Sequence, residues 1–303
     1  MSKLSFWIKN SRSVSLPQSA LPCLTAIVLC IGQDGFTWWL AFPVLLGVCA
    51  MHLGVNLADD YFDYKHDSRT RADISSTSVR ARMEKCHYLG EGEGKATISQ
   101  LGWAVVCFFA FAASMGAITF IAQWLLHGWQ AAIGIVVYAV LGLFFGINYA
   151  GKPLEFGYHG LGELVVGTMF GPLLMLGVQT ALTGCTFSWP MLCMSIGIGC
   201  MVTNIVYVHS VMEVNADAEL GKMTFARLLK NKAVMIVFIG LFALVPFAML
   251  ALGIILGWWS PWYLLTLATL PMSIYLIHST RLFAYGLPRN DTPHWWMGPM
   301  GNW

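Results

Sequence analysis

The sequence predicts an all-α, polytopic transmembrane helical bundle, and its composition and charge pattern lead to that fold class. Only 11% of the 303 residues are charged and 57% are hydrophobic, whereas a soluble domain averages about 25% charged residues. The charges lie in short clusters separated by long charge-free stretches. Each stretch is long enough for the roughly 20 apolar residues that a helix needs to cross a bilayer. Lipid is therefore the expected solvent for most of the surface.

The charge-free windows give eight predicted spans. Ser13–Gln33 and Gly35–Ala58 each hold one span. The longer windows Ala96–Gly151, Leu164–Met212 and Ala233–Thr280 each hold two, since a helix rises 1.5 Å per residue across roughly 30 Å of hydrocarbon.

Helix breakers and polar residues mark the expected turn inside each long window. These turns are predicted near His127–Gly128, Thr183–Gly184 and Gly257–Pro261. Trp and Tyr residues are frequent near several span ends, which is typical of the headgroup layer.

The charges predict the orientation of the spans. With eight spans, all 17 Lys and Arg residues fall on one side, and Asp34 is the exception among the 15 acids. The positive-inside rule places that side in the cytoplasm. We therefore expect one domain over residues 1–303 in the inner (plasma) membrane, with both termini and the loops at about 60–95 and 213–232 in the cytoplasm.

Four carboxylates follow the second predicted span, in NLADDYFDYKHD. Asp59, Asp63 and Asp67 recur every four residues, and Asp60 lies beside them. On a helix this spacing forms one acidic row, which Asn56 extends toward the membrane. Clustered carboxylate oxygens suit a hard divalent cation such as Mg²⁺, although an acidic, solvated helix end is the simpler alternative.

A second acidic pair, Glu213 and Asp217, follows the sixth predicted span at the same i, i+4 spacing. Asn204 and His209 lie further into the membrane on or near the same side. Two facing carboxylate clusters with basic loops nearby favour a diphosphate site, in which metal ions bridge carboxylates and phosphate oxygens. Acids at a helix end are also ordinary, so this pair alone leaves a structural role open.

The two acidic motifs resemble those of the UbiA superfamily of intramembrane prenyltransferases. The family motif N-D-x-x-D-x-x-x-D corresponds to Asp59-Asp60-x-x-Asp63-x-x-x-Asp67, with Asp in place of the leading Asn. Its D-x-x-x-D motif corresponds to Glu213-x-x-x-Asp217, with Glu in place of the first Asp. Both replacements keep an oxygen ligand.

Three further stretches resemble the 1,4-dihydroxy-2-naphthoate prenyltransferases of menaquinone biosynthesis. They are NLADDYFDY, the segment from Tyr149 to Glu163 that contains Pro153-Leu154 and Gly160-Leu161-Gly162-Glu163, and Gly221-Lys222-x-Thr224. Two features depart from the pattern. The loop Ser68–Ser99 is long and basic, and the family usually has nine spans instead of eight.

The resemblance implies Mg²⁺-dependent transfer of a polyprenyl group from its diphosphate to an aromatic acceptor, expected to be 1,4-dihydroxy-2-naphthoate. It implies metal ligands at Asp59, Asp60, Asp63, Asp67, Glu213 and Asp217, with Asp60, Asp63, Asp67 and Asp217 as the catalytic set. Expected substrate-binding residues are Asn56, Tyr149, Lys152, Lys222 and Arg82. Further candidates are Arg69, Arg71 and Arg80 for phosphate, His209 for the acceptor pocket, and Glu163, which also suits a helix N-terminus.

Alternatives remain open at this point. The same ionisation chemistry would serve another acceptor or a terpene cyclase, and a cation transporter would use intramembrane carboxylates. The acids at helix ends and the uncharged span interiors argue against transport. The expected partners are the two substrates and the lipid bilayer, with no nucleic acid. Prenyl chain length and oligomeric state have no signal in the sequence.

Overall fold

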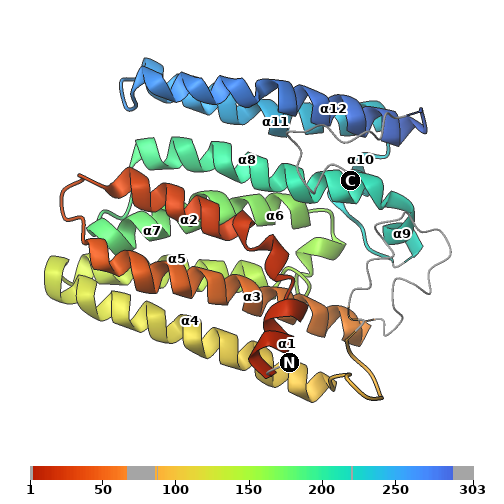
Figure 1. Cartoon of the computed structure of the whole chain (residues 1–303), viewed down its shortest axis with the longest axis horizontal. Helices are drawn as coiled ribbons and strands as arrows, with labels where there is room; N and C mark the ends of the chain where they lie inside the picture. Colours follow the sequence, from red (N-terminus) through yellow and green to blue (C-terminus); the bar gives the residue numbers. More distant parts are fainter. Residues whose placement is uncertain (1–2, 67–85, 87, 220, 289–303) are drawn as a thin grey trace.

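Long helices running side by side make up the protein in the computed structural model (Figure 1), which describes residues 3–66, 86, 88–219 and 221–288. Within these ranges, seven helical segments are long and apolar enough to cross a membrane. They are Ser13–Cys30, Trp38–Lys65, Ile98–His127, Trp129–Ile147, Gly162–Thr183, Trp189–Met212 and Lys232–Ile255. The predicted all-α, polytopic membrane bundle is thereby confirmed.

The long segments are built from the following helices: α2 (Pro17–Cys30), α3 (Ala41–His66), α4 (Ile98–His127), α5 (Trp129–Ile147), α6 (Gly162–Thr168), η5 (Met169–Leu173, a π-helix), α7 (Leu174–Thr183), α8 (Trp189–Met212) and α11 (Lys232–Ile255). The eighth predicted span forms η6 (Pro261–Thr269), a 3₁₀ stretch, followed by α12 (Leu270–Tyr285). Helix α12 has 16 residues, and the 3₁₀ stretch takes the place of its first turns. In Figure 1, α11 and α12 lie together beside α8.

Shorter elements lie between or beside these spans. They are α1 (Lys3–Asn10), η1 (Ser13–Ser15), η2 (Trp38–Leu40), η4 (Phe156–Tyr158), α9 (Val214–Glu219) and α10 (Phe225–Leu229). Helices α1, α9 and α10 lie at the same end of the bundle (Figure 1). The N-terminal segment and the loop after α8 therefore lie at the same end of the helical bundle, as the charge pattern predicted.

The predicted turns between paired spans fall where the sequence placed them. Helix α4 ends at His127, α7 ends at Thr183 and α11 ends at Ile255. Gly128, Gly184 and Gly257 follow with φ angles of 84°, 74° and 73°, a backbone region that disfavours residues with a Cβ atom. Glycine is thus what allows the chain to reverse at each tip.

Both predicted cytoplasmic loops contain more helix than expected. Helix α3 continues without a break through the first acidic motif to His66, so the first loop begins later than residue 60. The second loop contains α9 and α10. The continuation matters because it places Asp59, Asp60 and Asp63 on the same continuous helix as the second membrane span.

Small residues let α8 approach the preceding span closely. A Cβ atom at Gly199 would lie 2.7 Å from the Gly167 carbonyl oxygen, and one at Gly171 would lie 2.5 Å from the Ser195 carbonyl oxygen. Such close backbone contacts are typical of helix packing in membranes, where dispersion replaces the hydrophobic effect. This contact fixes α6 and α8 against each other, and both helices contribute side chains to the site described next.

Candidate active site

One cavity of about 1600 Å³ reaches both acidic motifs. Its acidic lining residues are Asp59 and Asp60 from α3, Glu163 from α6, Glu213 at the end of α8, and Asp217 from α9. Beyond this acidic end, the cavity continues along apolar side chains of α8, α11 and α12. The motifs that lie about 150 residues apart in the sequence thus face one shared space.

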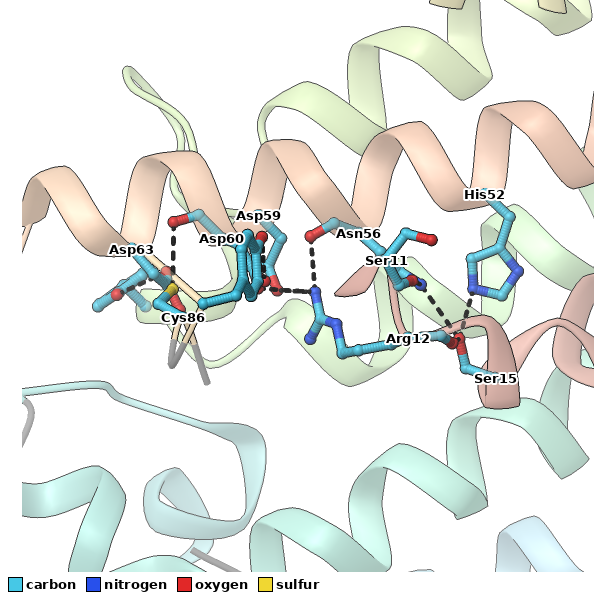
Figure 2. Close-up of polar contacts among 11 residues, drawn as sticks. Ser11, Arg12, Ser15, His52, Asn56, Asp59, Asp60, Asp63 and Cys86 are labelled. Carbon is cyan, nitrogen blue, oxygen red and sulfur yellow. Dashed lines mark hydrogen bonds and ion pairs between the residues drawn. The ribbon is translucent and has the colours of Figure 1, made fainter. Parts of the chain in front are cut away.

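Arg12 bridges the carboxylates of the first motif (Figure 2). Its Nη2 atom lies 2.9 Å from Asp59 Oδ2 and 3.2 Å from Asp60 Oδ1, and it donates to the Asn56 carbonyl oxygen at 2.8 Å. The two Asp side chains are 10% and 3% exposed, whereas the Arg12 side chain is 40% exposed. Burial by itself lowers the pKa of Arg12, but the charges of Asp60 and Asp59 outweigh it and raise that pKa above its usual value.

The backbone at Arg12 is also unusual, with a φ of 57°. This left-handed conformation costs a non-glycine residue roughly 1–2 kcal/mol. It separates α1 from η1 and turns the guanidinium toward α3, as Figure 2 shows. The contacts to α3 hold Arg12 in this conformation, so the N-terminal segment is part of the site.

Tyr88 and Tyr158 also donate hydrogen bonds to carboxylates of the first motif. The Tyr88 hydroxyl donates to Asp60 Oδ2 at 3.0 Å, and the Tyr158 hydroxyl donates to Asp63 Oδ1 at 2.9 Å. Burial raises the pKa of Tyr88, and the neighbouring Asp60 carboxylate raises it further, so Tyr88 stays protonated as a donor. Asp63 is therefore turned toward the loop that carries Tyr158, and it does not line the cavity.

Asn56 and His52 continue the row of α3 toward the membrane interior (Figure 2). The Asn56 amide nitrogen donates to the Ser11 carbonyl oxygen at 3.0 Å and to Ser15 Oγ at 3.1 Å. The ring nitrogens of His52 lie 3.2 Å from Ser15 Oγ and 2.6 Å from Ser19 Oγ. These contacts tie η1 and the start of α2 to α3 directly beside Arg12.

The second acidic motif sits where α8 gives way to α9. Glu213 terminates α8, and the Asp217 backbone N–H donates to its carbonyl oxygen at 2.8 Å, which preserves the predicted i, i+4 relation. Asp217 is buried. Arg227 from α10 donates to the carbonyl oxygens of Asp217 and Lys222, so α10 fixes the turn after this motif.

Lys222 lines the cavity beside Asp217. Its backbone N–H donates to the Asp217 carbonyl oxygen at 2.8 Å, and its ammonium lies 5.4 Å from the ring of Tyr158 and 5.9 Å from that of Tyr149. Cations over aromatic faces are attracted by the ring electrons. Because Tyr158 also donates a hydrogen bond to Asp63, this tyrosine connects α3 with the loop after the second acidic motif.

Glu163 fastens the loop that carries Lys222. Its two carboxylate oxygens each accept from the Phe225 backbone N–H at 3.1 Å. Glu163 is buried at 2% exposure, and the adjacent Thr224 hydroxyl lines the cavity without a hydrogen-bond partner among the described residues. The structure thus gives Glu163 a contact with the loop after the second motif in addition to its place at a helix start.

Most of the predicted binding residues that the structure describes lie together. Asn56, Tyr149, His209 and Lys222 line the cavity, whereas Lys152 is exposed on the surface and is not among its lining residues. Five predicted residues lie outside the described ranges: Asp67, Arg69, Arg71, Arg80 and Arg82.

Sequence reasoning missed Arg12, Tyr88 and Tyr158 as site residues. Their contacts join α3 to segments 28 to 95 residues away, which spacing within one segment does not reveal. The available signal was the shared side: each residue belongs to a segment that the charge pattern places at the acidic end.

The donor chemistry of the cavity suits Mg²⁺, since its acidic groups are all carboxylates and Mg²⁺ prefers oxygen ligands. Among the described residues, no three His, Cys, Asp or Glu side chains already form a cluster that could hold a metal ion. The reason is local, because Asp59 and Asp60 face Arg12 while Asp63 faces Tyr158. The cavity therefore offers the oxygen ligands that Mg²⁺ prefers. In this structure the carboxylates of the first motif bind Arg12 and Tyr158.

Comparison with known proteins assigns the chain to a family. The model of the UbiA prenyltransferase family matches residues 19–290. The chain belongs to the UbiA prenyltransferase family. It is accordingly a prenyltransferase and an integral membrane protein, as the motifs predicted.

Relatives of this UbiA protein include enzymes named for naphthoate and naphthoquinone substrates. It is 25% identical to the 1,4-dihydroxy-2-naphthoate octaprenyltransferase of Mycobacterium tuberculosis, over 90% of this chain and 85% of that protein. It is 24% identical to the enzyme of the same name from Bacillus subtilis, over 93% and 82% of the two chains. It is 27% identical to the 2-carboxy-1,4-naphthoquinone phytyltransferase of Synechocystis, over 89% and 81%.

Solved structures support the same fold. A digeranylgeranylglyceryl phosphate synthase superimposes with a TM-score of 0.61 at 15% identity, covering 94% of this chain and 88% of that one. A UbiA homologue from Archaeoglobus fulgidus, bound to GPP and Mg²⁺, superimposes with a TM-score of 0.52 at 10% identity, covering 93% and 98%. The helical bundle of this UbiA protein is therefore shared with proteins of low sequence identity.

Proposed function

We propose that this UbiA protein transfers a polyprenyl group from polyprenyl diphosphate to 1,4-dihydroxy-2-naphthoate, in a Mg²⁺-dependent reaction of menaquinone biosynthesis. The observation that carries the proposal is the single cavity that joins the two acidic motifs and continues between apolar helices. The names of the relatives support the naphthoate acceptor.

The charge balance of the cavity supports the need for a divalent cation. Among the described lining residues, five are acidic, and Lys9, Arg12 and Lys222 are basic, which leaves a formal charge of −2 with neutral His. A diphosphate is itself an anion, so it would meet net repulsion in this space. Mg²⁺ held by Asp59, Asp60, Glu213 and Asp217 would cancel that negative charge and stabilise the charge on the leaving diphosphate.

The chain's own residues supply the remaining parts of the reaction. Lys222 neutralises diphosphate oxygens from the loop that Glu163 and Arg227 hold in place, and Arg12 adds a second cation from the N-terminal segment. The allylic C–O bond breaks with its electron pair on the diphosphate. A carbon of the electron-rich ring then bonds to the prenyl carbon, and the ring regains aromaticity by releasing a proton or, from a carboxylated carbon, carbon dioxide.

The apolar part of the cavity suits the prenyl chain. Beyond the acidic end, its lining includes Ile198, Met201, Phe242, Phe247 and Leu250 from α8 and α11. Hydrocarbon placed there stays in apolar surroundings, as it does among the lipid chains. The same lining would shield an allylic cation from hydrolysis.

We further propose that the protein lies in the inner (plasma) membrane with its acidic end and N-terminus in the cytoplasm. The contact between Arg12 and α3 supports this arrangement, because it joins the N-terminal segment to the end of the bundle that carries the basic loops. The soluble aromatic acceptor would then reach the site from the cytoplasmic side.

A product assay with purified protein in detergent tests the proposal. The protein receives polyprenyl diphosphate and 1,4-dihydroxy-2-naphthoate, with either Mg²⁺ or EDTA, and the wild type is compared with Asp217→Asn. We expect a prenylated naphthalene product only with Mg²⁺ and only from the wild type. Diphosphate release without this product would move the function to another acceptor or to terpene cyclisation, and equal turnover in EDTA would refute the metal requirement.

A further inference from the structure

Asn204 is a buried amide in the apolar wall of the cavity. It lies on α8 and is 4% exposed, and its Oδ1 atom is buried with no hydrogen-bond partner among the described residues. It lines the cavity together with Met201, Ile205 and Val208. These positions follow one face of the helix, so the amide is a polar group within an otherwise apolar strip.

A buried acceptor without a donor costs roughly 1–3 kcal/mol. The cost points to a ligand, because most buried polar side-chain atoms have partners. A water held by α8 alone is a poor explanation here, since a buried water needs two to four polar partners, and Met201, Ile205 and Val208, which line the cavity beside Asn204, are apolar. The amide oxygen needs a ligand that brings its own hydrogen-bond donor.

The proposed substrates differ in this respect. A prenyl chain has no donor, and an ionised diphosphate has only acceptors. A shared metal ion is excluded by distance along α8, because nine residues separate Asn204 from Glu213, which is about 13.5 Å of helix. A hydroxylated aromatic ring does carry an O–H donor, and it is small enough to lie between Asn204 and the acidic end.

We propose that Asn204 binds the aromatic acceptor, with its Oδ1 atom accepting a hydrogen bond from a ring hydroxyl. The inference rests on the proposed function and adds the specificity of the enzyme for its acceptor. The acceptor must be a phenol or naphthol, and a ring without a free hydroxyl binds more weakly. The hydrogen bond holds one edge of the ring in the apolar wall, so the opposite edge faces the diphosphate end.

The test compares the wild type with Asn204→Leu, which has nearly the same shape and no polar atoms. Steady-state kinetics with 1,4-dihydroxy-2-naphthoate should show a KM for the acceptor about 5- to 15-fold higher in the variant. The KM for the prenyl diphosphate should not change. The 1,4-dimethyl ether of the acceptor, used as a competitive inhibitor, should bind both proteins equally because it has no O–H to donate.

Thermal unfolding separates a binding role from a structural one. Asn204→Leu removes an unsatisfied buried group, so its unfolding midpoint should be equal to or higher than that of the wild type. Thr203→Val is the matched control, since Thr203 is equally buried on the adjacent position of α8 and does not line the cavity. Asn204→Val serves as a smaller second variant if the Leu protein does not fold.

Three results would overturn the inference: an unchanged acceptor KM in Asn204→Leu, an equal rise in Thr203→Val, or a lower midpoint accompanied by losses for both substrates. Failure of the proposed function is visible separately, because the wild type would then form no product from prenyl diphosphate and the naphthol.

Discussion

Arg12 and Mg²⁺ should compete for the carboxylates at the end of α3. Arg12 contacts Asp59 at 2.9 Å and Asp60 at 3.2 Å, and both acids are nearly buried. If these carboxylates also hold the metal, the guanidinium neutralises them while the metal is absent and must give way when it binds. The Arg12→Ala variant separates these two states.

The expected size of the effect follows from burial. Removing one partner of a fully buried ion pair costs about 3–5 kcal/mol, whereas exposed pairs contribute about 0.2–1 kcal/mol. Because the Arg12 side chain is 40% exposed, we expect Arg12→Ala to destabilise the metal-free protein by about 1–3 kcal/mol. That loss corresponds to a midpoint lower by about 2–8 °C.

Mg²⁺ should restore most of this loss. A metal that no longer displaces Arg12 gains up to the same 1–3 kcal/mol in affinity, which makes the apparent Kd about 5- to 150-fold lower. Thermal unfolding of the detergent-purified protein across a MgCl₂ titration, with EDTA as the zero point, measures both quantities. Arg12→Lys should fall between the two proteins, because an ammonium keeps the charge and loses the guanidinium geometry.

The control is Lys3→Ala, which removes a positive charge from an exposed position of α1. It should leave both the midpoint and the Mg²⁺ dependence unchanged. Identical midpoints and identical titration curves for wild type and Arg12→Ala would refute the reasoning, because the guanidinium would then neither stabilise the carboxylates nor compete for them.

Three further predictions concern the loops and the helix packing. Lys222→Gln should raise the KM for prenyl diphosphate about tenfold, and Lys152→Gln should leave it nearly unchanged, since of these two lysines Lys222 alone lines the cavity. Steady-state kinetics that show the reverse order would exchange their roles. Glu163→Ala should lower the free energy of unfolding by about 1–3 kcal/mol, because it leaves the first N–H of α10 without its acceptor. Glu163→Gln keeps an acceptor, so thermal unfolding should show a smaller loss of stability. Equal losses in the two variants would contradict the hydrogen-bond account. Gly199→Ala should destabilise by about 1–3 kcal/mol because its Cβ would lie 2.7 Å from a backbone oxygen of α6, whereas Gly116→Ala, with no atom within 4 Å, should be neutral or stabilising in the same assay.

The fold was largely predictable because lipid imposes simple rules on sequence. A spanning helix needs a charge-free window, and a tight reversal needs a residue such as Gly128 that tolerates a positive φ. The end of α3 was harder to place, because Asp59 to His66 are mostly polar and yet helical. Packing and the contacts of Arg12, Tyr88 and Tyr158 hold this segment in the helix, and none of these contacts is local in the sequence.

The site was predictable only along single helices. The acidic row of α3 and the Glu213–Asp217 pair follow from helical spacing, and both line the cavity in part. Lys152 shows the limit of this reasoning. It stands beside a motif in the sequence, but it lies in a turn, and the order of residues in a turn does not say which way a side chain points. Lys222 lines the cavity because Glu163 and Arg227 fix its loop from other elements.

The polar side chains at the end of the bundle opposite the acids bear on the choice between prenyl transfer and cation transport. Gln179 donates to Gln33 at 3.2 Å and accepts from Ser188 at 3.0 Å, and Gln123 donates to the Ala181 carbonyl oxygen at 2.7 Å. These four polar side chains pair with protein groups between α2, α4, α7 and α8, and none of them lines the cavity. A transported cation would need a path through this end. A prenyl cation instead needs water kept out, and in the proposed reaction the diphosphate binds at the end of the cavity that the acidic residues line.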